Sequence, residues 1–106
     1  MEIIRGTTPT IQINVKSDVD LTAVSQVWVY LTQLNNVLID KLISDVTIDA
    51  VNKKITVTLT QTDTLKLQSG LMALFQVRLL LNDGTALATV AVDVPVLEVY
   101  KGGVIT

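Results

Sequence analysis

The chain has 106 residues with no cysteine and no histidine, and 49% of its residues are hydrophobic although only 4% are aromatic. Its formal net charge is −2, from 8 basic and 10 acidic residues. The missing cysteine and histidine exclude disulfides, zinc–thiolate sites and nucleophiles activated by histidine. Without a run of Lys or Arg, nucleic acid is not an expected partner. The length predicts one domain, residues 1–106.

The first strand signal follows a short interruption, Arg5-Gly6-Thr7-Thr8-Pro9, in a β-branched apolar run. A phosphate-binding loop needs several glycines, a lysine and a following helix, so this segment does not fit one. Gly6 instead predicts a bend, and Pro9 predicts the start of a strand. Residues 10–16, TIQINVK, then alternate between apolar and polar side chains.

Residues 17–25 break the alternation, and 26–34 resume it as QVWVYLTQL. This pattern places Val27, Val29 and Leu31 on one face of a strand and Trp28 with Tyr30 on the other. Asn35-Asn36 predicts a two-residue hairpin turn into 37–43, because asparagine tolerates left-handed backbone angles.

Two strands and a helical turn are predicted next. Residues 45–51 and 54–60 read as strands joined by a turn at Asn52-Lys53. Thr60 followed three residues later by Asp63 is the pattern of a capping box. We therefore expect one short helix over 61–67 that crosses between sheets.

The last third of the chain predicts three strands. Residues 71–81 alternate with Gln76 and Arg78 on the polar face, and Asn82-Asp83-Gly84 is a hairpin turn with glycine placed for positive φ. Segments 86–94 and 96–100 follow as strands. Pro95 between them marks an edge or a crossing point, because proline cannot donate to a central ladder.

These elements predict an all-β fold, an antiparallel β-sandwich of about seven to nine short strands, immunoglobulin-like or jelly-roll-like, with one short helical turn near 61–67. A small barrel is the alternative. The sequence is not expected to carry a signal peptide. Its apolar stretches are all much shorter than the roughly 20 residues that a membrane-spanning helix needs, so a membrane is not expected as a partner.

The sequence offers few groups for chemistry. Asp18-x-Asp20 lacks the remaining ligands of a calcium loop, so the pair is interpreted as stabilising a turn. A hydrolase using two Asp would need a cleft with paired carboxylates, and no such pair stands out. We predict no enzyme activity, no catalytic or metal-ligating residues, and no cofactor.

Trp28 and Tyr30 are the main candidates for a binding surface. Two aromatic side chains on one strand face either pack against protein or stack on sugar rings. Because no cluster of polar sugar ligands accompanies them, a protein interface is favoured, with a carbohydrate-binding module for a bacterial surface glycan as the alternative. The terminal strand adds Val96, Val99 and Tyr100 as second candidates, because exposed strand edges pair readily with other chains.

Several short motifs together resemble a known group. They are Arg5-Gly6-Thr7-Thr8-Pro9, Val27-Trp28-Val29, Leu59-Thr60-Gln61-Thr62-Asp63-Thr64-Leu65, Asp83-Gly84 and Gly103-Val104-Ile105. Over nearly the whole chain, the sequence resembles small uncharacterised prophage-encoded β-sandwich proteins. It is also similar, more loosely, to the N-terminal domain of phage upper-baseplate (tail) proteins.

This resemblance implies a phage structural protein. The expected role is non-enzymatic: a tail or baseplate assembly module that acts through protein–protein contacts. The implied partners are further copies of the chain, other phage tail proteins, or both. The implied location is the virion tail, after synthesis in the cytoplasm of the bacterial host. The resemblance supplies no functional residues.

Overall fold

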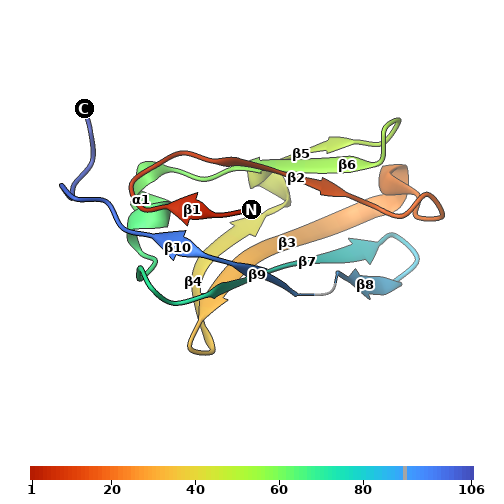
Figure 1. The fold of residues 1–106 in the computed structure, drawn as a ribbon. Helices are drawn as coiled ribbons and strands as arrows, with labels where there is room; N and C mark the ends of the chain where they lie inside the picture. Colours follow the sequence, from red (N-terminus) through yellow and green to blue (C-terminus); the bar gives the residue numbers. More distant parts are fainter. Residues whose placement is uncertain (90) are drawn as a thin grey trace.

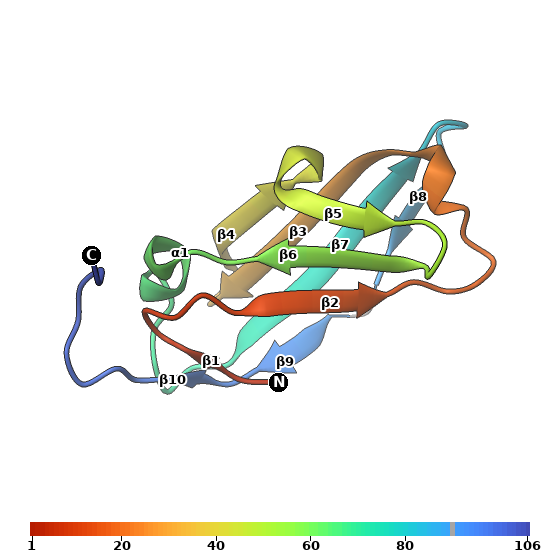
Figure 2. The ribbon, with the colours of Figure 1, turned by 90° about the horizontal axis from the view of Figure 1, so that it is seen from above.

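The computed structural model describes residues 1–89 and 91–106, and it confirms the predicted all-β sandwich. Two layers of strands face each other across the core, as the edge-on view shows (Figure 1). Seen from above, the strands of the two layers cross at an angle (Figure 2). The interior is filled by aliphatic side chains of both layers, with Phe75 as the aromatic member of this core.

The smaller layer is an antiparallel sheet in the order β2-β6-β5. Its strands are β2 (Thr10–Asn14), β6 (Lys54–Thr58) and β5 (Val46–Asp49). The predicted alternation is confirmed in this sheet, because Ile11, Ile55 and Val57 are buried.

The larger layer is a five-stranded antiparallel sheet. β4 (Asn36–Leu42) pairs with β3 (Val24–Gln33), which pairs with β7 (Ala73–Leu81). The far side of β7 pairs with both β8 (Ala86–Ala88) and β9 (Val92–Val94). The sequence predicted a single strand over 86–94. The structure divides this segment into β8 and β9, and residue 90 lies outside the described residues.

A parallel pair of two-residue strands, β1 (Ile3–Ile4) and β10 (Val96–Leu97), joins the two ends of the described chain. This pair was not predicted, and with the division of 86–94 it raises the strand number to ten. The prediction for Pro95 is confirmed, because this residue lies where the chain leaves the β7 sheet and enters the pair with β1.

Helix α1 (Gln61–Leu65) connects β6 to the loop before β7, and two 3₁₀ turns span Leu21–Ala23 and Ile43–Asp45. The predicted capping box is confirmed. The Thr60 hydroxyl accepts from the Asp63 N–H at 3.0 Å, and the Asp63 carboxylate accepts from the Thr60 N–H at 2.9 Å.

The hairpin between β3 and β4 differs by one residue from the prediction. Leu34 and Asn35, with φ of 51° and 64°, form the turn, and Asn36 already pairs with Gln33. Two positive φ values in succession are typical of the type I′ turn that suits the twist of a hairpin. By contrast, the turn at Asn82-Asp83-Gly84 is confirmed, with Gly84 at φ 89°.

Candidate interaction face

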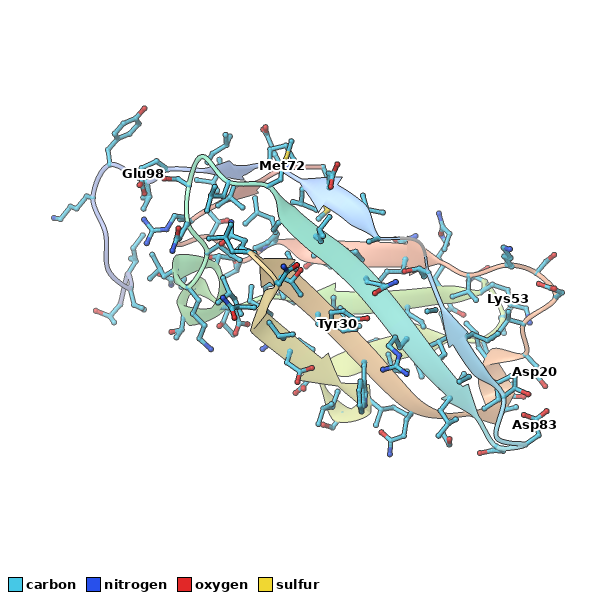
Figure 3. The ribbon with its side chains drawn as sticks, turned by 90° about the horizontal axis from the view of Figure 1, so that it is seen from below. Asp20, Tyr30, Lys53, Met72, Asp83 and Glu98 are labelled. Atoms are coloured by element: carbon cyan, nitrogen blue, oxygen red, sulfur yellow. The ribbon has the colours of Figure 1, made fainter. Side chains whose placement is uncertain are left out.

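The candidate site is the outer face of the five-stranded sheet, which we call the Trp28 face. As predicted, Trp28 and Tyr30 lie on the strand face opposite Val27, Val29 and Leu31; the latter three are completely buried, and the structure places the former two on the outside. Figure 3 looks onto this face and shows Tyr30 in its middle. Within the described part of the chain, no strand of either sheet covers it.

Two rows of side chains cross the face at its centre. In one row, Trp28 lies between Leu42 on β4 and Arg78 on β7. The Arg78 guanidinium carbon is 5.1 Å from the centroid of the Trp28 ring, within the range of a cation–π contact. Trp28 remains 47% exposed, so Arg78 covers the indole only in part.

The adjacent row contains Tyr30, with Asp40 beside it on β4 and Gln76 on β7. The Tyr30 hydroxyl donates to Oε1 of Gln76 at 2.6 Å, and Nε2 of Gln76 donates to the Thr89 carbonyl at 2.7 Å. These bonds fix the Tyr30 ring, which is half-buried. The centre of the face therefore has a defined arrangement before any partner binds.

Around this centre the face is mostly apolar, with Asp93 on β9 beside Leu74 as an exposed charge. Leu74 and Leu80 on β7 and Leu42 and Val37 on β4 are exposed. A shallow hollow of about 160 Å³ lies on this face, and Trp28, Leu80 and Ala86 line it together with Gln26 and Arg78. A partner side chain placed in this hollow would contact aliphatic and aromatic carbon.

The outer face of the smaller sheet is different in kind. Its outward positions are polar: Thr10, Gln12 and Asn14 on β2, Thr56 and Thr58 on β6, and Thr47 on β5. Thr10 and Thr58 hydroxyls are hydrogen-bonded across the strands at 2.9 Å. The same alternation thus produces one face suited to water and one that leaves tryptophan and leucine exposed.

The structure separates the other predicted interface residues from the Trp28 face. β10 belongs to the pair with β1, and Glu98, which follows it, lies far from Tyr30 in Figure 3. Val96 is 3% exposed and packs in the core, so its side chain cannot contact a partner in this conformation. Val99 is half-buried, and Tyr100 is fully exposed.

Arg5 of the RGTTP segment holds the chain ends together. Its Nε donates to the Leu67 carbonyl at 2.8 Å, and its Nη2 donates to the Leu65 carbonyl at 3.1 Å. Its Nη1 forms an ion pair with Glu98 at 2.5 Å. Gly6 has φ 78° and forms the expected bend. All three guanidinium contacts are to the protein itself, so the segment has a structural role.

The exposed carboxylates also serve local structure. Hydrogen bonds from the Thr22 hydroxyl and N–H hold the pKa of Asp20 below its usual range, and bonds from Asn52 and Thr85 do the same for the pKa of Asp49 and of Asp83. Within residues 1–89 and 91–106, no group of three or more acidic side chains could hold a metal ion. Asp20 of the Asp18-x-Asp20 pair caps the 3₁₀ turn at Leu21–Ala23 through its bonds from Thr22.

Asp63 is the one acidic side chain that the described structure buries. Burial opposes ionisation of its carboxyl, but hydrogen bonds from Lys41 and Thr60 outweigh this effect and hold its pKa below the usual range. Lys41 Nζ lies 2.7 Å from the Asp63 carboxylate. A general acid at neutral pH needs a raised pKa, and this pair gives the opposite.

Sequence reasoning identified the centre of the Trp28 face but did not include Arg78, Leu74, Leu80 and Leu42. A signal was present in the strand over 71–81, where leucine occupies the outward positions on both sides of Gln76 and Arg78. Outward leucines at both ends of a central strand indicate a face that is not fully solvated.

Comparison with known proteins adds no family: no protein-family model matches the chain, and no curated protein matches it. Among the described residues, no helix is long and apolar enough to cross a membrane.

Proposed function

We propose that the protein is a non-enzymatic assembly module of a phage tail or baseplate, and that it acts through protein–protein contacts made by the Trp28 face. The tail context rests on the sequence resemblance. The contact surface rests on one observation: Trp28, Tyr30 and Arg78 lie side by side on an uncovered sheet face.

These three residue types are the ones in which binding hot spots are enriched. Here they occupy the centre of the face, and exposed leucines surround them. In protein interfaces, an apolar surround of this kind keeps water away from the central contacts. The Tyr30–Gln76–Thr89 hydrogen bonds reduce the entropy that binding would cost, because the aromatic side chain is already ordered.

The proposal is tested by incorporation into particles. Tail particles are purified from induced cells that produce the wild-type chain or Trp28→Ala, and the chain is quantified by mass spectrometry. We expect wild type in the particles and a loss of about tenfold or more for Trp28→Ala, as for a hot-spot residue. Val51→Ala is the matched control, because Val51 is 90% exposed on the β5–β6 turn, away from the face. Absence of the wild-type chain from the particles, or equal incorporation of Trp28→Ala, would refute the proposal.

A carbohydrate-binding module is the second candidate function, because Trp28 is 47% exposed and could stack on a sugar ring. Two observations favour protein instead: Arg78 already covers part of the indole, and the Tyr30 hydroxyl is already bonded to Gln76. Glycan-array binding that Trp28→Ala abolishes and Val51→Ala retains would establish the carbohydrate function in its place.

A further inference from the structure

We infer that the partner of the Trp28 face is a second copy of this chain, docked face to face about a two-fold axis that passes between Trp28 and Tyr30. This inference rests on the proposed function of the face and adds the identity of the partner and the residues that pair. It follows from three properties: the positions of the charged groups, their lack of ion-pair partners in the described part of the chain, and the size of the face.

Two charged side chains of the face, Arg78 and Asp40, are arranged about the midpoint between Trp28 and Tyr30, whereas Asp93 lies further out, beside Leu74. Arg78 lies beside Trp28 on β7, and Asp40 lies beside Tyr30 on β4, on the opposite side of β3. A two-fold axis that lies in the interface and passes through that midpoint can interchange the two positions. Arg78 of each copy then meets Asp40 of the other, and the contact contains two identical ion pairs.

Neither charge forms an ion pair inside the described chain. The ion pairs found within residues 1–89 and 91–106 are Arg5–Glu98 and Lys41–Asp63. Arg78 stacks on Trp28, a contact that uses the plane of the guanidinium and leaves its N–H groups for an acceptor. Asp40 is exposed at the rim. The face thus carries a cation and an anion that complement a copy of itself.

The face is large enough for a stable contact. β3 has 10 residues, which is about 33 Å of strand, and the strands β4, β3, β7 and β8 lie side by side over about 19 Å. Because β4 has 7 residues and β8 and β9 have 3 each, the strands of the face cover about 500 Å² per copy and about 1,000 Å² for both copies, at the lower limit of specific interfaces. A net charge of −2 adds little repulsion between copies at physiological salt.

Charge exchange tests this arrangement directly. Arg78→Glu gives two acidic groups at the paired positions, and Asp40→Arg gives two basic groups. Each variant alone places like charges opposite each other in the dimer, and we expect its dissociation constant to rise by about tenfold or more. Neither side chain is buried, so both variants are expected to fold.

An equal mixture of the two variants restores both ion pairs. The glutamate introduced in one variant meets the arginine introduced in the other. The native Asp40 of the first variant meets the native Arg78 of the second. The mixture should therefore dimerise where each variant alone does not.

The measurement is light scattering after size exclusion, with each variant tested alone and mixed. Wild type should approach twice the chain mass of 11.5 kDa as concentration rises, each variant should stay near 11.5 kDa, and the mixture should recover the doubled mass. Trp28 is the only tryptophan, so its emission should shift to shorter wavelength on dimerisation. Lys54→Glu, on the other sheet, changes the net charge by the same amount as Arg78→Glu and should leave the dimer intact.

Wild type at 11.5 kDa up to millimolar concentration would overturn the inference, as would variants that dimerise like wild type or a mixture that stays monomeric. These results are distinct from failure of the proposed function. A monomeric chain that still enters tail particles through Trp28 would refute only the second copy as partner.

Discussion

Separating Lys41 from Asp63 should destabilise the fold measurably, because the pair fixes α1 against β4. The Lys41 side chain is 19% exposed and the Asp63 side chain 10%, and their charged atoms are 2.7 Å apart. Breaking a fully buried pair costs about 3–5 kcal/mol, whereas a surface pair contributes about 0–1 kcal/mol. The intermediate burial of this pair places Asp63→Asn at about 2 kcal/mol of lost unfolding free energy.

The assay is a double-mutant cycle with Asp63→Asn, Lys41→Met and the double variant, each unfolded by urea at neutral pH. The asparagine side chain introduced by Asp63→Asn can still accept from the Thr60 N–H, so the cycle isolates the charge interaction from the capping box. With an m value of about 1–3 kcal/mol/M, a loss of about 2 kcal/mol lowers the urea midpoint by about 1 M. Thr60→Ala, which removes only a cap, should cost about 1 kcal/mol.

The double variant decides whether this reasoning holds. Lys41→Met keeps the aliphatic stem and removes the buried charge, so the double variant should be more stable than the sum of the single losses predicts, by about 1–2 kcal/mol. A coupling energy near zero would mean that the ion pair adds nothing, and that the two side chains act only through packing and capping.

Three further predictions concern pH, the chain ends and a turn. The pKa of Asp63 is lowered in the folded state, so its contribution to stability is complete above its unfolded pKa of about 3.9 and is lost as pH falls through the folded value. Asp63→Asn should therefore flatten the fall in thermal midpoint below about pH 4, and an unchanged slope would contradict this. Arg5→Lys keeps the charge but not the forked contacts to Leu65, Leu67 and Glu98, and it should lower stability by about 1–2 kcal/mol. Glu98→Gln should lower the thermal midpoint in calorimetry less than Arg5→Lys does, because the Glu98 side chain is 46% exposed; similar losses for both variants would mean that the contacts of Arg5 with the carbonyls do not matter. Replacing Leu34-Asn35 by Asn-Gly should raise stability by about 1 kcal/mol in the same assay, because Leu34 is 71% exposed at a φ of 51° that leucine disfavours; a lower thermal midpoint would count against the turn assignment.

The faces of the long strands could be predicted from sequence because alternation is a local property. Val27, Val29 and Leu31 needed only the period of two to be assigned inward. The β3–β4 turn was displaced by one residue because two consecutive asparagines leave its position ambiguous. Its register is set by Leu31 facing Ile39 in the core and by an irregularity after Leu31, which is a tertiary constraint.

The pair of β1 with β10 could not be predicted for a different reason. A two-residue strand has no periodicity to detect, and Ile3 meets Val96 across almost the whole chain. The burial of Val96 follows from that pairing, so no local pattern could exclude this residue from the candidate interface. The contacts of Arg5 with the Leu65 and Leu67 carbonyls are equally non-local.

The exposed leucines and tryptophan of β3 and β7 have one competing explanation, which is that strands simply favour bulky side chains. Aromatic and β-branched residues stabilise strands through cross-strand pairs wherever they face. The smaller sheet argues against this account, because its outward positions stay polar: threonine satisfies the same preference on β6 and β5, and Gln12 and Asn14 stand on β2. Leucine at positions 74 and 80 has no such β preference to explain it. If bulky outward side chains served only to stabilise strands, both sheets of the sandwich would carry them. A binding surface would place them on one sheet only, and of these two sheets, in the part of the chain that the structure describes, the five-stranded one alone carries them.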